Sequence, residues 1–138
     1  MNFVYFTDRD LGKRFPAILR TSGLTVERHA NHFAHDAPDE LWLEQVGKRR
    51  WIALTHDRRI RYKPNELNAV MQHGVALLVI VGKAPFPDLA RAFVNSRLVV
   101  ERFLQQNKPP FIAKVYRRSL SETEQRSTAP GRIEHWYP

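Results

Sequence analysis

Three aspartates stand where carboxylates from distant parts of the chain could share a cation. Asp8 directly follows the apolar residues 2–7, Asp57 follows residues 51–55, and Asp39 opens an amphipathic stretch. Carboxylates within a few ångströms of one another repel, which raises at least one pKa unless a cation neutralises them. Oxygen ligands without cysteine suit Mg²⁺ or Mn²⁺, and such an ion can activate water and hold phosphate oxygens. We therefore predict a catalytic metal site made by these three residues.

Further acids lie close to these three in the sequence and are additional candidate ligands. They are Asp10, Asp36 and Glu40. Each has an alternative role, since Asp and Glu are favoured at helix N-caps and in first turns. Asp10 could cap a helix that follows it, Asp36 could cap the next one, and Asp39 and Glu40 fall in that helix's first turn. Asp8 and Asp57 are harder to explain as caps because both directly follow apolar strands.

Basic residues flank the acids and could position a phosphodiester backbone. The predicted RNA-binding residues are Arg9, Lys13, Arg58, Arg59 and Arg61. Cations beside a metal–carboxylate site are what a phosphodiester substrate needs for binding and register. The alternative is that these side chains are simply solvated. Tyr62 could stack on a base if it is exposed.

Histidines at 29, 32 and 35 have a regular spacing of three that suggests zinc. They lie in a polar stretch without a second ligand cluster, which does not match a closed zinc pattern. Surface histidines, or a histidine near a phosphate site, explain them better. His56 precedes Asp57 and could support the metal ligands.

The elements that must position these residues follow from hydrophobic periodicity. Short apolar runs predict strands at residues 2–7, 24–27, 51–55, 75–81 and 111–116. Apolar spacings of three and four predict helices at residues 11–22, from Asp39 to a stop at Gly47, at residues 65–73, and as one long helix over residues 86–106. Glycine suits the position just past a helix end.

Alternation of strands and helices predicts a three-layer α/β/α fold around a central five-stranded parallel sheet. Residues 75–81 read VALLVIV, as expected of a strand covered on both faces. We expect residues 1–117 to form one domain and residues 118–138 a polar C-terminal tail. In open parallel sheets, ligands bind beyond the carboxyl ends of the strands, where Asp8 and Asp57 are expected.

Composition narrows the classes of function. The chain has 22 Lys and Arg against 14 Asp and Glu, a formal net charge of +8, which favours a polyanionic partner such as nucleic acid. Solubility or an acidic protein partner are the alternatives. The chain has no cysteine, which excludes disulfides, thiolate metal sites and a cysteine nucleophile. No apolar run approaches the roughly 20 residues that span a bilayer, and the N-terminus turns acidic early, so we expect a cytoplasmic protein.

Three motifs together resemble the PIN-like domain family, specifically the compact group of VapC-type toxins. They are YFTDRDLG at residues 5–12, HDAPDELWL at residues 35–43 and WIALTHDRRI at residues 51–60. The resemblance covers about residues 3–82, with the order and spacing of the motifs preserved. The second and third motifs together are fairly specific.

The resemblance implies a PIN-like fold and a metal-dependent endoribonuclease, often the toxin of a toxin–antitoxin pair. By position, Asp8 matches the family's first-strand acid, Asp39 its helix acid and Asp57 the acid after the third strand. It also implies Mg²⁺ or Mn²⁺ as cofactor, an RNA substrate, a small antitoxin as partner and a homodimer. Many relatives have another acid two or three residues beyond the third one, where this chain has Arg59 and Ile60.

That departure leaves two rival functions open. A non-catalytic RNA- or protein-binding module would use the same scaffold and basic surface without metal affinity. A phospho-receiver domain also has acids after its first and third strands, but it needs a hydroxyl after the fourth. This chain has Gly82-Lys83 there, which argues against a receiver.

Overall fold

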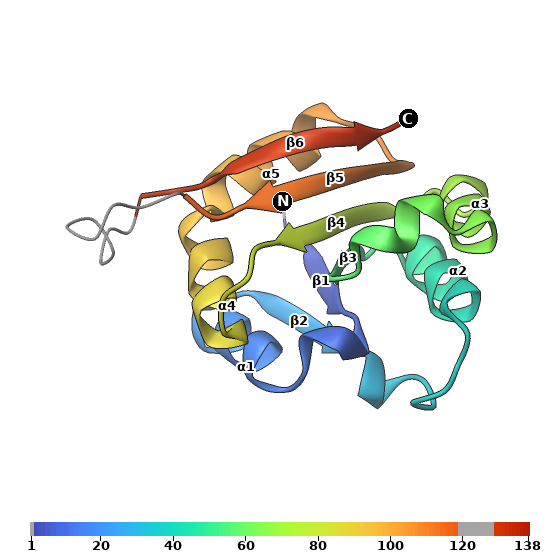
Figure 1. Cartoon of the computed structure of the whole chain (residues 1–138), viewed down its shortest axis with the longest axis horizontal. Coiled ribbons are helices and arrows are strands. Elements are labelled where there is room, and N and C mark those ends of the chain that lie inside the picture. The colour runs from blue at the N-terminus through green and yellow to red at the C-terminus, as the bar shows by residue number, and fades with distance from the viewer. Residues whose placement is uncertain (1, 119–128) are drawn as a thin grey trace.

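The computed structural model describes residues 2–118 and 129–138. Six strands form one sheet: β1 (Val4–Thr7), β2 (Thr25–Arg28), β3 (Ile52–Thr55), β4 (Ala76–Val81), β5 (Phe111–Tyr116) and β6 (Arg132–Tyr137). Their spatial order is β2-β1-β3-β4-β5-β6, and the first five are parallel (Figure 1). The α-helices are α1 (Arg14–Thr21), α2 (Asp39–Arg49), α3 (Pro64–Gln72), α4 (Phe86–Asn95) and α5 (Arg97–Gln106). Three short 3-10 helices are η1 (Arg9–Leu11), η2 (His29–Asn31) and η3 (Arg58–Tyr62).

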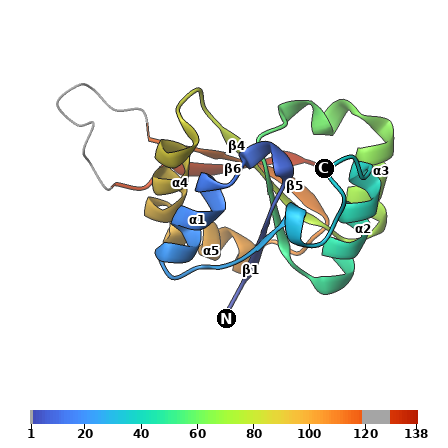
Figure 2. The same ribbon diagram turned by 90° about the horizontal axis from the view of Figure 1, so that it is seen from below.

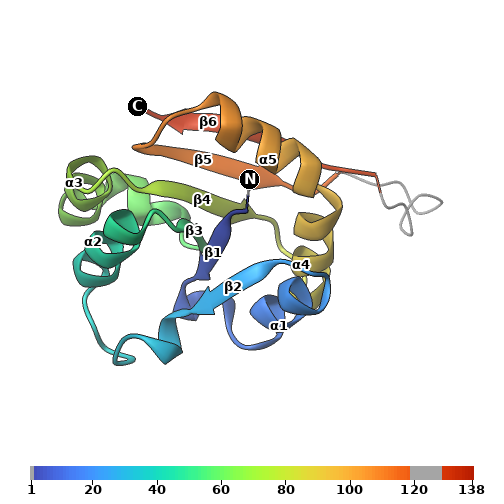
Figure 3. The ribbon, with the colours of Figure 1, turned by 180° about the vertical axis from the view of Figure 1, so that it is seen from behind.

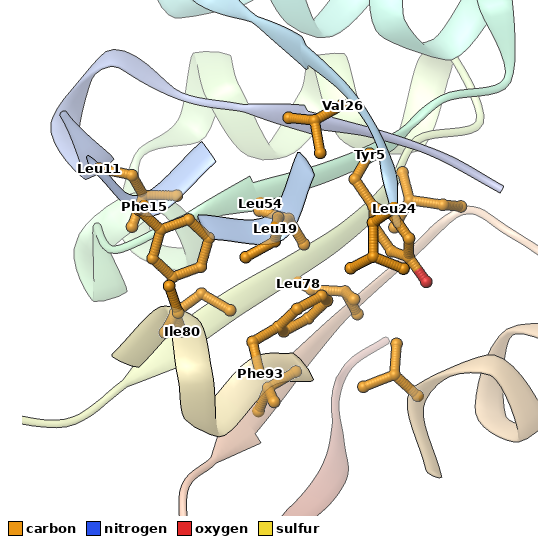
Figure 4. Packing of buried hydrophobic residues seen from close by; sticks show 14 of the residues in the cluster. Tyr5, Leu11, Phe15, Leu19, Leu24, Val26, Leu54, Leu78, Ile80 and Phe93 are labelled. Atoms are coloured by element: carbon orange, nitrogen blue, oxygen red, sulfur yellow. The ribbon is translucent and has the colours of Figure 1, made fainter. Parts of the chain in front are cut away.

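Helices cover both faces of the sheet, as predicted for a three-layer α/β/α fold. In Figure 2, α1, α4 and α5 lie on one side of the strands, and α2 and α3 lie on the other. The strands alternate between the two layers: Tyr5 and Leu54 belong to the first hydrophobic cluster, whereas Phe6 and Ala53 belong to the second. Figure 4 shows the first cluster, in which Phe15 and Leu19 of α1 meet the sheet and α4. Two-sided burial explains why β3 and β4 are almost uniformly apolar.

The expectation of five strands was wrong, because a sixth strand extends the sheet. β6 pairs antiparallel with β5 and forms the outer edge (Figure 3). Its polar composition, RIEHWY, conceals a strand because an edge strand with one exposed face does not need a continuous apolar run. These residues fall in the segment 118–138 that we expected to be a polar tail, of which residues 119–128 lie outside the described structure.

Two helix boundaries also differ from the expectation. The long helix expected over residues 86–106 is two helices that meet at Ser96, whose hydroxyl donates to the carbonyl of Ala92 at 3.0 Å. Such bonding to the preceding turn competes with the helical ladder. In α2, Gly47 does not end the helix, which continues to Arg49 before Arg50 takes a left-handed conformation with φ of 57°. Gly47 instead permits close packing, since a Cβ there would overlap the carbonyl oxygen of His73.

The strand order places a crevice at a defined point. The chain moves outward from β1 to β2 and then returns to place β3 on the other side of β1. In doubly wound sheets, ligands bind beyond the carboxyl ends of the strands at this switch point. Here it lies between the ends of β1 and β3, where Asp8 and Thr55 are neighbours. Across residues 2–118 and 129–138, we find no helix with the length and apolar character needed to span a membrane.

Candidate active site

Asp8 lies at the carboxyl end of β1, held beside the end of β3. Its backbone N–H continues the pairing of the two strands by donating to the carbonyl of Leu54 at 2.9 Å. The side chain is 6% exposed. It accepts hydrogen bonds from the N–H of Arg9 at 2.7 Å and from the hydroxyl of Thr55 at 2.9 Å. The first bond caps η1, so Asp8 combines the capping role that we considered for other acids with a place in the site.

Asp10 turns back from η1 toward the same threonine. Its carboxylate accepts from the hydroxyl of Thr55 at 3.2 Å and from the backbone N–H of His56 at 3.1 Å. Gly12 ends η1 with a positive φ of 70°, which favours glycine. The threonine hydroxyl therefore lies between two carboxylates that are two residues apart in the sequence.

Asp39 lies in the first turn of α2, as predicted, and is 17% exposed. One of its oxygens accepts from the indole N–H of Trp42 at 2.9 Å and from the guanidinium of Arg9 at 3.2 Å. Trp42 is fully buried, so the indole fixes the carboxylate from the core side. Asp39 thus points toward the residue that follows Asp8.

Asp57 follows β3 and caps η3 through the N–H of Arg59 at 2.9 Å. The guanidinium Nε of Arg59 approaches the same oxygen at 3.3 Å, and Lys63 Nζ approaches the other at 2.7 Å. The backbone N–H of Asp57 donates to the Thr55 hydroxyl at 3.2 Å. Asp57 is therefore adjacent to the Asp8–Thr55–Asp10 group, but its own charge is balanced by two cations.

The acids differ sharply in their electrostatics. Burial, reinforced by the charges of Asp10 and Asp39, raises the pKa of Asp8 to about 7 despite the hydrogen bonds it accepts. Burial also raises the pKa of Asp10, and the charge of Asp57 contributes. Burial acts on Asp57 in the same direction, yet hydrogen bonds from Lys63 and Arg59 outweigh it and lower its pKa. Ionisation is thus disfavoured at Asp8 and Asp10 and favoured at Asp57.

A divalent cation fits the chemistry of this donor set. Asp8 and Asp10 supply hard oxygens that share one hydroxyl and resist ionisation, and a cation beside them would relieve that cost. Asp39 and Asp57 are electrostatically coupled to them but are held by Arg9 and by Lys63 with Arg59. Within the described residues, no three His, Asp or Glu side chains gather closely enough to form a metal-binding group as they stand.

We call Asp8, Asp10, Asp39 and Asp57 the acid cluster. The other two candidate acids do not join it. Asp36 and Glu40 are both exposed, and neither carboxylate makes a hydrogen bond or ion pair within the described ranges. Neither caps α2, because Pro38 occupies the N-cap position without a side-chain bond.

The histidines are dispersed among different partners. His29 is 1% exposed and its Nε2 lies 3.0 Å from Arg9 Nη1; burial, together with the charge of Arg9, lowers its pKa. His32 lies 3.6 Å from Glu27. In the described part of the chain these residues form no zinc-binding group. His56 supports Asp10 through its backbone, while its ring contacts the Gly82 carbonyl at 3.0 Å.

The predicted RNA-binding residues separate into three settings. Arg9 and Arg59 contact Asp39 and Asp57 and so border the acid cluster. Lys13 and Arg58 are exposed. Arg61 lies against the aromatic rings of Tyr62, Trp136 and Tyr137.

Sequence reasoning missed the two residues that organise the cluster. Thr55 was assigned only to a strand, yet its fully buried hydroxyl links Asp8, Asp10 and Asp57. A polar residue at the end of an apolar strand, directly before His-Asp, was the available signal. Lys63 was not among the predicted RNA-binding residues, although it forms the shortest ion pair of Asp57.

A family model described as a PIN-like domain matches residues 1–82, which include all four clustered acids. The chain belongs to the PIN-like domain family. PIN-like domains have a nuclease-type fold, commonly bind RNA and generally use divalent metals. Among curated proteins and among solved structures, none matches this PIN-like chain significantly.

Proposed function

We propose that this PIN-like protein is a metal-dependent endoribonuclease whose active site is centred on Asp8 and Asp10. The observation that carries the proposal is that two carboxylates share the Thr55 hydroxyl: that of Asp10, and that of Asp8, which is buried and has its pKa raised to about 7. Two neighbouring carboxylates whose ionisation is unfavourable destabilise the folded protein unless a bound cation neutralises them, and such pairs are typical of functional sites. Family membership supports a nuclease-type role.

In the proposed site, Asp8 and Asp10 would hold Mg²⁺ or Mn²⁺. Asp39 and Asp57 would join them as ligands once the basic side chains that now pair with these two acids bind the substrate instead. When bound, the ion supplies positive charge next to the scissile phosphate and lowers the pKa of a water molecule. Thr55 orients both carboxylates by donating its hydroxyl proton between them. Arg9, Arg59 and Lys63 border the acids and bind phosphate oxygens of the RNA backbone.

We further propose the biological setting of a toxin controlled by a small antitoxin. The motifs at residues 5–12, 35–43 and 51–60 resemble VapC-type toxins, and the PIN-like family sometimes has antitoxin partners. An acid cluster at one edge of the sheet could be blocked by a single basic side chain of such a partner. Co-purification of the chain with the product of an adjacent gene, with loss of cleavage in the complex, tests this setting.

One observation favours a second candidate, a non-catalytic RNA-binding module. Arg9 on Asp39, and Lys63 with Arg59 on Asp57, already neutralise two of the four acids. A module that had given up catalysis could retain these ion pairs as structural links. It would bind RNA through its basic surface but would show no divalent-cation dependence.

Cleavage of single-stranded RNA with Mn²⁺ or Mg²⁺, and with EDTA in their place, separates the two candidates. We expect cleavage only with the cation, and its abolition in Asp8→Asn, Asp10→Asn and Asp57→Asn. Asp88→Asn is the matched control because Asp88 is an exposed aspartate on α4 whose ion pair is with Arg91. Full activity in Asp8→Asn or Asp10→Asn, or cleavage unaffected by EDTA, would refute the nuclease assignment.

A further inference from the structure

An exposed aromatic residue lies just beyond the acid cluster. Tyr62 ends η3 and is 67% exposed, one of three large hydrophobic side chains that are exposed in the described structure. Its ring meets that of Trp136 from β6 edge to face, with 5.9 Å between the centroids. The C-terminal end of β6 lies on the α3 side of the molecule in Figures 1 and 3, which brings these distant parts of the chain together.

Two cations accompany these rings. The guanidinium carbon of Arg61 lies 5.3 Å from the ring centroids of both Tyr62 and Trp136, and 5.4 Å from that of Tyr137. The ammonium of Lys114, on β5, lies 3.9 Å from the Trp136 centroid. Such contacts are favourable because the ring faces carry negative potential. We call Tyr62, Trp136, Arg61 and Lys114 the aromatic–cationic patch.

Within the patch, Arg61 is held by the rings. Its Nε is buried without a hydrogen-bond partner among the described atoms. The guanidinium therefore fixes Tyr62 and Trp136 relative to each other, whereas most of the Tyr62 ring remains in solvent. Structural packing alone accounts for Trp136, which contacts the second hydrophobic cluster, but not for the exposure of Tyr62.

We propose that the aromatic–cationic patch binds single-stranded RNA, with a base stacked on Tyr62 and the adjacent phosphates beside Lys114 and Arg61. Stacking on exposed aromatic residues together with neutralisation of phosphates is how proteins bind single strands without reading sequence. A duplex keeps its bases stacked on one another and cannot use the ring face. The choice of RNA as ligand rests on the proposed function.

The chain connects this patch directly to the acid cluster. Tyr62 is followed by Lys63, whose ammonium lies 2.7 Å from Asp57. A 3-10 helix rises about 2 Å per residue, so Tyr62 lies about 10 Å beyond Asp57 along η3. An RNA strand whose phosphates bind at Lys63 would reach Tyr62 next. Stacking on Tyr62 would then hold the RNA on one side of the cleavage point.

The test measures binding of a short, fluorescently labelled single-stranded RNA by anisotropy in EDTA, where metal-dependent cleavage cannot occur. We expect Tyr62→Ala to weaken binding about 5- to 150-fold, the range for loss of one stacked base. Tyr62→Phe should bind as the wild type does because it keeps the ring face. The matched control is Tyr116→Ala, which removes a tyrosine that also contacts an arginine, Arg132 at 4.0 Å, but outside the patch.

Three results would overturn the patch: unchanged binding by Tyr62→Ala, equal weakening by Tyr62→Phe, or equal weakening by Tyr116→Ala. Weakening for an RNA duplex as large as for the single strand would remove the stacking explanation. Circular dichroism melting of each variant excludes unfolding as the cause. This outcome is separate from the outcome for catalysis. If the wild type cleaves RNA but Tyr62→Ala binds RNA normally, only the patch is rejected. Ring-dependent binding without any metal-dependent cleavage rejects only the nuclease.

Discussion

Thr55 makes the site depend on a single hydroxyl group. It donates to Asp8 and Asp10, lowering the pKa of each, and accepts from the N–H of Asp57. Its side chain is fully buried, so water cannot easily replace it. Removing the hydroxyl leaves the buried carboxylate of Asp8, the carboxylate of Asp10 and one N–H without that partner.

Thr55→Val should reduce RNA cleavage by about 10- to 100-fold, the usual effect of losing a group that orients metal ligands. Thr55→Ser should keep most of the activity because it keeps the hydroxyl. Initial cleavage rates at saturating Mn²⁺ measure both variants. Equal rates for wild type and Thr55→Val would show that the hydroxyl does not organise the site.

Asp8 should make the metal-free protein less stable as the pH rises. Its pKa is about 7 in the folded chain and about 3.9 when unfolded, so the folded state binds more protons between these values. The stabilisation from Asp8 is complete below about pH 4 and is lost as the pH rises through about 7. Asp57 acts in the opposite sense, because its lowered pKa gives stabilisation that is lost as the pH falls.

Asp8→Asn should therefore raise the free energy of unfolding in EDTA at pH 8 by about 4 kcal/mol, the equivalent of about three pKa units, with little change at pH 4. Denaturant titrations at the two values measure this difference. Asp88→Asn, at an exposed position, should change neither. If Asp8→Asn were less stable than the wild type at pH 8, ionisation of the Asp8 carboxylate would not be what destabilises the folded protein.

Among the helices and strands, the sequence predicted the parts governed by periodicity and strand ends. Asp8 and Asp57 were expected beyond β1 and β3, and Asp39 at the start of α2, and the structure places them there. The joining of Asp8 and Asp10 by Thr55 could not be predicted, since it depends on how η1 turns back over the end of β3. Nor could β6, whose pairing with β5 supplies the stability that its polar sequence does not indicate.

Gly47 was expected to matter, but the reason that its position in the sequence suggested was wrong. It was expected to end α2, yet it lies inside the helix where His73 approaches. Gly47→Ala should destabilise the fold by about 2–3 kcal/mol, because a backbone carbonyl cannot move aside easily. Gly23→Ala is the control: it has a positive φ of 94° but open space around it, so only the cost of about 1 kcal/mol for that conformation is expected. Thermal unfolding of both variants compares them, and an equal or smaller effect at Gly47 would contradict the packing explanation.

Across the protein as a unit, the charge of +8 and the acid cluster would serve different steps of the proposed cleavage. The basic side chains would attract the polyanion, whereas the acids at the switch point would need a cation before a phosphate could approach. The RNA affinity in EDTA should therefore depend strongly on salt. Three phosphate contacts would give a slope of about −2 for log affinity against log salt concentration. A slope near zero in an anisotropy titration would mean that the basic surface does not contact the backbone.

We propose that Asp8 and Asp10 share a divalent cation, and calorimetric titration of Mn²⁺ into the purified protein measures this binding without any RNA present. The wild type and Asp88→Asn should bind the ion alike, and Asp8→Asn and Asp10→Asn should each bind it at least about tenfold more weakly. No Mn²⁺ binding by the wild type, or unchanged affinity in both Asp8→Asn and Asp10→Asn, would contradict the claim.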